Sequence, residues 1–246
     1  MPNEIRWEIN RDALYRHQLM MIDLIGTNKF RRDINIMNPS YIKDVYPLVN
    51  TYSIQEGMVY KLTPYPVYGE ARFDSEKSYN YFMNGDGTSP LKWGNLTSPD
   101  VYIDNAVTLN SAIVQRQTYG MLAQQLIEEG KPEKAKDMLM QAETHFPNVN
   151  FPLDKYSIFF IKLYVDVNDT AKATQYFDEI LNLYEQELAY YSQFKGVKAR
   201  GVLSNMQEAA QAVYILQNNA ERTLKDTERT AKAKAVLDKY IGVLGR

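Results

Sequence analysis

The chain has 246 residues, of which 45% are hydrophobic, so it is long enough for one large domain or two modest domains with packed cores. Its net charge is -2 with acids and bases interspersed, which argues against a nucleic-acid surface, and its lack of cysteine excludes disulfides, thiolate catalysis and thiolate metal sites. No stretch approaches the roughly 20 apolar residues that span a bilayer, and the start of the chain is too polar for a signal sequence, so we expect a soluble segment as given.

The first hundred residues mix helical and extended patterns. Apolar spacing predicts a helix over 12–25 that ends at Gly26. Two strands are expected, over 30–36 and 58–62, with a turn over 38–40 after the first. Residues 63–104 are rich in Pro, Gly, Asn and Tyr and predict an ordered connector with one short helix over 75–83. We therefore expect a small mixed α/β domain, with its Tyr/Pro-rich connector, over 1–104.

Residues 119–147 carry the spacing of one tetratricopeptide repeat, which is a pair of antiparallel helices. The pattern places a large aromatic, a Leu and a small residue on the first helix, then small and bulky residues and a closing Pro on the second. The matching positions are Tyr119, Leu122, Ala123, Leu126, Ala135, Leu139, Ala142 and Pro147. Gly130 and Pro132 lie between the helices, where Gly suits a helix end and Pro a helix start. The small residues Ala123 and Ala135 are expected to let the two helices nest closely.

Two further helical pairs are expected after this one. A looser copy of the repeat places apolar or small side chains at Phe160, Ile161, Tyr164, Ala173, Phe177 and Ile180. Because Glu185 replaces the closing Pro, the second helix of this copy can continue to Tyr191. An Ala-rich third pair, over 202–216 and 227–244, lacks the motif, as is typical of a terminal cap. The predicted fold class is mainly α: a tetratricopeptide-like helical-hairpin solenoid over 105–246, preceded by the small α/β domain.

Two phrases in the first half resemble a known family. One is Glu-Gly-Met at 56–58 followed by Tyr60, Leu62 and Pro64, and the other runs over 74–104 and contains Lys-Trp-Gly-Asn at 92–95. With the helical repeats, they resemble the C-terminal soluble region of bacterial membrane proteins that are similar to protein O-mannosyltransferases. The family's Arg-Pro-Ile-Tyr-Phe strand is replaced here by Arg-Asp-Ile-Asn-Ile at 32–36, so any ligand contact of those aromatics does not carry over.

The resemblance implies a cellular setting for the chain. It would be the extracytoplasmic part of a longer membrane glycosyltransferase-like protein, at the periplasmic face of an inner membrane. The transferase-like part, with its acidic catalytic loops, would lie outside this chain, and Met1 would be an expression start.

No motif in the sequence predicts catalysis, a metal or a cofactor. His17 and His145 are far apart on predicted helices, and neither has a partner at metal-ligand spacing. His145 simply suits the C-terminal end of a helix dipole. Neither a nucleophile elbow nor a phosphate-binding Gly loop is present, and the turn over 84–88 lacks the acidic residue that a calcium loop needs. We expect a segment that is not an enzyme.

Binding of a protein or peptide is the predicted function. First helices line the concave side of a stack of helical hairpins, where an extended guest or a partner helix can lie. The polar candidates for this groove are Gln117, Gln124, Gln125, Lys155 and Lys162. Such side chains pair with backbone amides or carboxylates of a guest. The alternative is that they only keep the surface hydrated.

Two other interpretations stay open. Trp93 with Tyr79 and Tyr102 has the makings of a stacking platform for a carbohydrate, although a large aromatic in a loop is more simply explained as buried where the domains join. The third interpretation is structural, with the segment bracing the membrane-embedded part of the same polypeptide or pairing with itself. The burial of Trp93 and the character of the groove discriminate among the three.

Overall fold

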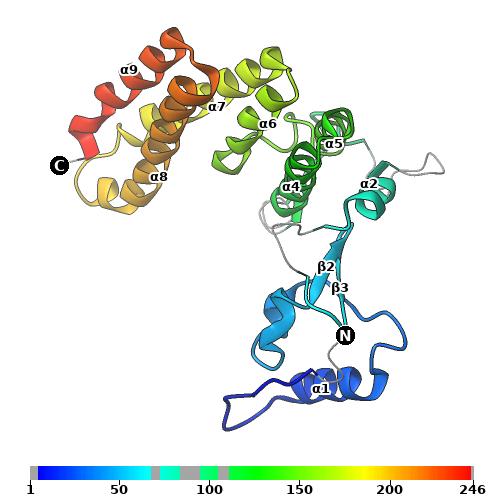
Figure 1. The fold of residues 1–246 in the computed structure, drawn as a ribbon. Coiled ribbons are helices and arrows are strands. Elements are labelled where there is room, and N and C mark those ends of the chain that lie inside the picture. The colour runs from blue at the N-terminus through cyan, green and yellow to red at the C-terminus, as the bar shows by residue number, and fades with distance from the viewer. Residues whose placement is uncertain (1–4, 68–72, 84–94, 105–110, 245–246) are drawn as a thin grey trace. The chain divides into compact units, whose positions relative to one another are not determined.

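The computed structural model describes residues 5–67, 73–83, 95–104 and 111–244. The chain divides into two compact units, Met1–Lys92 and Trp93–Arg246. It is mainly helical, with a small antiparallel sheet in the first unit (Figure 1). The predicted domain boundary after residue 104 adjoins 105–110, which lie outside the described residues, so that boundary stays a prediction.

In its described residues, the first unit combines a three-stranded sheet with two helices. Its elements in chain order are α1 (Arg16–Asn28), β1 (Asn35–Ile36), the 3-10 turns η1 (Pro39–Tyr41) and η2 (Pro47–Asn50), β2 (Ser53–Glu56), β3 (Val59–Leu62) and α2 (Ser75–Met83). The strand order is β1-β3-β2 and both pairings are antiparallel. The bounds of α2 are those predicted, and β3 begins one residue after its predicted start.

Three expectations about this unit are corrected. Helix α1 begins at Arg16 and continues past Gly26, and it ends where Lys29 takes the left-handed conformation with φ 49°. The strand expected over 30–36 shrinks to Asn35–Ile36, because Phe30 also has a positive φ, 56°, which an extended strand does not allow. Strand β2 has no counterpart among the predictions, since its sequence Ser-Ile-Gln-Glu lacks the apolar alternation that announces a strand.

The core of the first unit lies between α1, the two 3-10 turns and the sheet. Its buried members are Ile25, Ile34, Ile36, Ile42, Val45, Tyr46, Val49 and Leu62. Trp7 closes one side of this core: its indole N–H donates to the Val45 carbonyl (2.8 Å) and its ring meets the ring of Tyr46 edge-on, with centroids 5.0 Å apart. Burial raises the pKa of the Tyr46 phenol to about 12.

The turn of the β2–β3 hairpin is fastened to α2. Gly57 has φ 62°, and a Cβ atom there would lie 2.6 Å from the ring of Tyr81, so only glycine fits. The Gly57 amide donates to the Ser78 hydroxyl (2.9 Å), and the buried Gln55 side chain donates to the Gly57 carbonyl (3.0 Å). The Glu-Gly-Met phrase therefore marks a hairpin turn that anchors α2.

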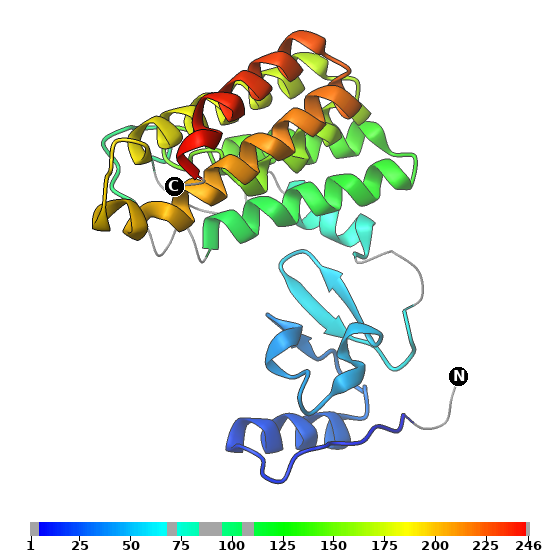
Figure 2. The same ribbon diagram turned by 90° about the vertical axis from the view of Figure 1, so that its left-hand side faces the viewer.

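The second unit is built of successive helical pairs. Its elements are α4 (Ile113–Glu128), α5 (Pro132–His145), the 3-10 turn η4 (Lys155–Ser157), α6 (Phe159–Asp166), α7 (Thr170–Tyr191), α8 (Val197–Asn219), the π-helical turn η5 (Ala220–Leu224) and α9 (Thr227–Leu244). Helix α4 packs on α5, α6 on α7 and α8 on α9, and α7 also packs along α8 (Figure 2). The three predicted pairs are present, and α7 continues to Tyr191 as predicted.

The first helical pair buries the positions that the spacing singled out. The side chains with 0% exposure include Tyr119, Leu122, Ala123, Leu126, Ala135 and Leu139. Ala123 and Ala135 are therefore fully enclosed, and a larger side chain at either position would have to displace its neighbours. Gly130 follows α4 with φ 73°, which lets the chain reverse into α5.

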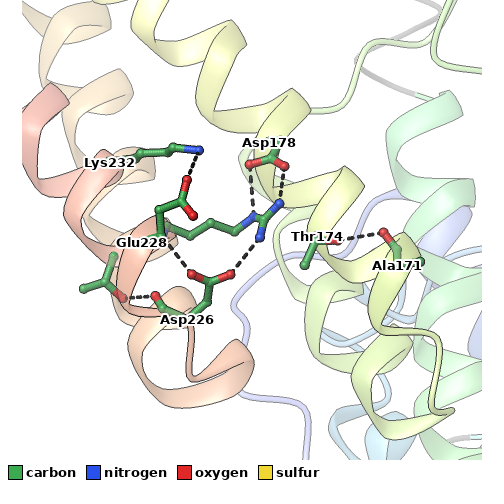
Figure 3. Close-up of polar contacts among 8 residues, drawn as sticks. Ala171, Thr174, Asp178, Asp226, Glu228 and Lys232 are labelled. Carbon is green, nitrogen blue, oxygen red and sulfur yellow. Dashed lines mark hydrogen bonds and ion pairs between the residues drawn. The ribbon is translucent and has the colours of Figure 1, made fainter.

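One guanidinium joins α9 to α7. Arg229 donates Nε–H to Asp178 Oδ1 (3.1 Å) and Nη2–H to Asp178 Oδ2 (2.6 Å), so the contact is bidentate (Figure 3). Its Nη1 donates to Asp226 Oδ2 (2.7 Å), and Asp226 accepts the Arg229 backbone N–H (2.9 Å) at the start of α9. The start of α9 is thereby held on the surface of α7.

Candidate functional site

A pocket of about 430 Å³ opens in the second unit between α4, η4, α6 and α8. It is lined by Gln124, Ile127, Glu128, Lys155, Ile158, Phe159, Lys162, Leu163, Asp166, Ile215 and Asn219. Its volume falls in the range of roughly 300–1,000 Å³ that is usual for ligand pockets. Residues three or four positions apart share one face of a helix, which explains why 124, 127 and 128 line it from α4 and 159, 162, 163 and 166 from α6.

The lining combines apolar side chains with balanced charges. Five of the lining residues are aliphatic or aromatic, namely Ile127, Ile158, Phe159, Leu163 and Ile215. Two cations, Lys155 and Lys162, stand against two acids, Glu128 and Asp166, so the lining has no net charge. Such a pocket favours a guest with one apolar group and neutral polar groups over a strongly charged one.

Neighbouring side chains in the lining already pair with each other. Gln124 donates Nε2–H to Glu128 Oε1 (2.9 Å), and the Lys162 ammonium donates to Asp166 Oδ2 one turn later on α6. Both contacts are solvent-exposed, and exposed pairs of this type contribute only about 0.2–1 kcal/mol to stability. The polar groups of a guest could therefore replace one member of each pair at a small cost in free energy.

Lys155 is a polar residue of the lining that is held in position by contacts with other elements. Its backbone N–H donates to the Tyr184 hydroxyl on α7 (2.7 Å), and its ammonium lies 2.7 Å from Glu208 on α8. The hydrogen bond to Glu208 raises the pKa of Lys155. The Asp154 and Ser157 side chains close a capping box around η4, which fixes the turn that carries Lys155. Contacts from three elements therefore place this ammonium beside the pocket.

A buried arginine supports the same turn from α4. Arg116 donates to the carbonyls of Phe151 (2.9 Å) and Pro152 (3.2 Å) and to Asp154 Oδ1 (3.2 Å). Its side chain is only 5% exposed. Burial lowers the pKa of Arg116, and the charge of Asp154 acts in the opposite direction. Arg116 thus ties the chain before η4 to the first helical pair.

Gly120 lies on the side of α4 that faces the aromatic rings of α6. A Cβ atom at this position would lie 2.9 Å from Phe160 Cζ and closer still to the ring of Phe159. Phe159 lines the pocket, so the absence of a side chain at Gly120 gives this ring its place. The close approach of the two helices therefore shapes one wall of the pocket.

The structure brings three of the five predicted groove residues together. Gln124, Lys155 and Lys162 all line the pocket. Gln117 shares the face of Gln124 but lies two turns, about 10 Å, toward the start of α4. Gln125 is buried and donates to Glu129 Oε1 (2.8 Å), because one step along a helix turns the side chain by about 100° away from Gln124.

Eight of the eleven lining residues were absent from the predicted groove, among them the two that α8 contributes. Ile215 and Asn219 lie near the end of α8, and the Asn219 amide donates to the Ile215 carbonyl (3.0 Å). No local signal in the sequence points to them, because their place in the lining depends on how the third helical pair stacks on the second.

The aromatic platform for a carbohydrate stays a prediction. Trp93 lies outside the described residues. Tyr79 lies half-buried in α2 of the first unit, and Tyr102 belongs to the second unit and is 86% exposed.

The two histidines belong to different units. His17 is exposed on α1, where its ring stacks on Tyr15. His145 is the last residue of α5, is buried, and lies with Nδ1 2.9 Å from the Tyr119 hydroxyl. Over the described ranges, no cluster of three His, Cys, Asp or Glu side chains has the arrangement of a metal site. The turn over 84–88 that was weighed as a calcium loop lies outside those ranges.

Comparison with known proteins gives one similarity. Residues 1–79 match the family model of TMEM260-associated domain 2, which covers the first unit as far as α2. No curated protein and no solved structure matches the chain. Among the helices in the described ranges, none combines the length and apolar character needed to cross a bilayer. The similarity indicates a membrane-protein context for the first unit.

Proposed function

We propose that the second unit is a tetratricopeptide-like helical repeat and acts as a non-catalytic scaffold that binds a protein or peptide in the pocket between α4, α6 and α8. The observation that carries this proposal is the convergence of Gln124, Lys155 and Lys162 on one partly apolar pocket. Concave surfaces of stacked helical hairpins are the usual sites at which such proteins hold extended guests.

Burial of the repeat positions supports the tetratricopeptide assignment. In the second helical pair the equivalent positions Phe160, Ile161, Tyr164, Ala173, Phe177 and Ile180 have at most 2% exposure, as small as in the first pair. Two consecutive pairs thus bury the expected positions, and Ala173 repeats the small contact of Ala135, although Ile161 and Ile180 are large where the first pair has Ala123 and Ala142.

The pocket suggests the chemistry of its guest. An apolar side chain of a peptide would contact Ile158, Phe159 and Leu163, where it leaves water. The amides of Gln124 and Asn219 would pair with the peptide backbone, and the neutral lining imposes no charge on the guest. The expected guest is a short segment with one large apolar residue.

The test is a pull-down from envelope extract with the purified chain and two double variants. Gln124→Ala with Lys162→Ala removes two pocket groups. The matched control, Gln175→Ala with Lys232→Ala, removes one exposed Gln that bonds a Glu four positions on and one exposed Lys from an ion pair within its own helix, both outside the pocket.

Each result of this pull-down has a defined meaning. A partner that the control retains and the pocket variant loses supports the scaffold. A partner retained by both variants moves the contact elsewhere and contradicts the proposed pocket. Self-association of the chain with no other protein captured favours a structural brace instead.

We further propose that the chain belongs to the extracytoplasmic region of a membrane glycosyltransferase-like protein, at the periplasmic face of the inner membrane. The match of residues 1–79 to a domain associated with a membrane protein supports a membrane context. The chain contains no cysteine, so Lys136→Cys, at an exposed position of α5, gives a single thiol. Labelling of this variant in intact cells by a membrane-impermeant maleimide supports the placement, and labelling only after lysis contradicts it.

A further inference from the structure

Helix α1 and its N-cap residue Tyr15 present a mixed face to solvent, on which large apolar side chains flank the exposed Asp23 and Thr27. The side chains of Tyr15, Leu19, Met20 and Leu24 are 70%, 53%, 64% and 43% exposed. The opposite side of the helix, which includes Ile25, is buried in the core of the first unit. Helix α1 lies at one edge of that unit (Figure 1). The described part of the unit therefore leaves large apolar side chains uncovered along most of a 13-residue helix.

A shallow groove of about 840 Å³ follows this face. Its lining includes Met20, Met21 and Leu24 on the helix and Arg31 and Arg32 just beyond the end of the helix. Long, flexible methionine side chains adapt to irregular or mobile surfaces. The groove thus places apolar groups next to two cations.

The charge of this segment is opposite to that of the whole chain. Between residues 16 and 32 four cations, at 16, 29, 31 and 32, stand against the single acid Asp23, which gives +3 in a chain with a net charge of -2. All four cations are exposed. Among contacts between described residues, none of the four takes part in an ion pair, whereas Lys61 in the same unit pairs with Asp33 (2.7 Å).

We propose that this face of α1 docks onto an anionic lipid bilayer. Leu19, Met20 and Leu24 would enter the interfacial region, and Arg31 and Arg32 would bind lipid phosphates. Helices that lie in a bilayer interface combine these two features, because burial of apolar area and attraction to anionic headgroups add together.

Charge complementarity selects the bilayer over a second copy of the chain. A two-fold contact through α1 would bring the two +3 segments face to face, and like charges across an interface oppose association. An anionic surface satisfies the unpaired cations and accepts the apolar side chains at the same time. The inference does not depend on the peptide pocket, which lies in the other unit.

The test is flotation of the full chain with lipid vesicles. We expect binding to vesicles of phosphatidylcholine mixed with phosphatidylglycerol, little binding to phosphatidylcholine alone, and weaker binding as salt rises. Arg31→Gln with Arg32→Gln should lower the affinity roughly 25-fold, because each cation near an anionic surface contributes about fivefold. Met20→Ser with Leu24→Ser should also lower it, by removal of apolar area.

Matched variants in the second unit control for total charge and apolarity. Lys195→Gln with Lys198→Gln removes two exposed cations, and Val114→Ser with Met140→Ser removes two exposed apolar side chains. Both are expected to float like the unchanged chain. Circular dichroism confirms that each variant keeps its helix content, which the exposure of all these side chains makes the expected result.

Three outcomes would overturn the inference. The first is no binding to anionic vesicles, the second is equal binding to neutral vesicles, and the third is equal loss in the α1 variants and their controls. A dimer in sedimentation that dissociates on Met20→Ser with Leu24→Ser, without vesicle binding, would assign the face to a second copy. Loss of partner capture by the pocket variant has no bearing on flotation, so the two proposals fail separately.

Discussion

The Tyr119 hydroxyl lies 2.9 Å from Nδ1 of His145, and this hydrogen bond joins the middle of α4 to the end of α5. Both side chains are buried, and the ring of Phe146 meets each of them edge-on. The imidazole thus completes the aromatic layer of the first helical pair.

The burial of His145 should make stability depend on pH. Burial lowers the pKa of His145 below its ordinary value of 6.5, so the unfolded chain binds a proton more readily than the folded chain. Its contribution to stability is complete above about pH 6.5 and is lost as pH falls toward the lower pKa of the folded state. His145→Asn should flatten this part of the profile of unfolding free energy against pH, measured by urea unfolding. An unchanged slope in His145→Asn would refute the assignment.

Gly120→Ala should destabilise the second unit although alanine favours helices. The new methyl group would overlap Phe159 and lie 2.9 Å from Phe160, and overpacking of this kind costs about 1–3 kcal/mol, against a helix-propensity gain of roughly 1. Gly201→Ala is the matched control, because a Cβ there has nothing within 4 Å, so it should gain about 0.5–1 kcal/mol. Thermal unfolding of both variants measures the contrast, and a stabilising Gly120→Ala would show that α4 and α6 are further apart.

Arg116→Met should lower the free energy of unfolding by about 3 kcal/mol, since it leaves two carbonyls and one carboxylate without their buried cation. The free energy of unfolding of Arg116→Lys should lie between those of the unchanged chain and of Arg116→Met, because an ammonium keeps the charge but cannot reach all three acceptors. Arg200→Met removes an exposed arginine from α8 and serves as control, with little expected change. Urea unfolding monitored by far-ultraviolet circular dichroism gives the three values, and equal stability of Arg116→Met and Arg200→Met would contradict the role given to Arg116.

Arg229→Gln should loosen the start of α9. The guanidinium is the link from Asp178 on α7 to Asp226 before α9, and its loss frees both carboxylates (Figure 3). Amide hydrogen exchange over 227–232 should become faster. Lys232→Gln breaks an ion pair with Glu228 inside α9 and should leave this exchange unchanged. The same acceleration in both variants would mean that the link to α7 does not hold the helix.

Helices with strong local signals and strand β3 could be predicted from the sequence, and strand β2 could not. The 3.6-residue spacing of apolar side chains gave the three helical pairs, and helix α2 was found with its bounds. Strand β2 was not predicted because the polar Gln55 occupies a buried position. Its side-chain amide donates a hydrogen bond to the Gly57 carbonyl there. The signal that was available is Gly57 itself, placed between two short runs as in a hairpin turn.

Only some of the pocket residues could be predicted, because the others depend on how the helices pack. Gln124 and Lys162 could be placed on first helices by periodicity, but the burial of Gln125 depends on which side of α4 meets the rest of the unit. Lys155 was expected on a helix and lies in η4, where Asp154 and Tyr184 position it. Ile215 comes from an element 87 to 91 residues beyond Gln124 and Glu128, so only the tertiary stacking reveals it.

The contribution of α8 to the pocket has a consequence for occupancy and folding. A guest can meet its complete set of contacts only after the polypeptide has folded through Asn219, because the last wall comes from the third helical pair. Binding in the proposed pocket would then be linked to folding of the second unit as far as the end of α8. A saturating ligand should raise the melting temperature of the unit as a whole, by mass action, and truncation before α8 should leave a fragment without affinity.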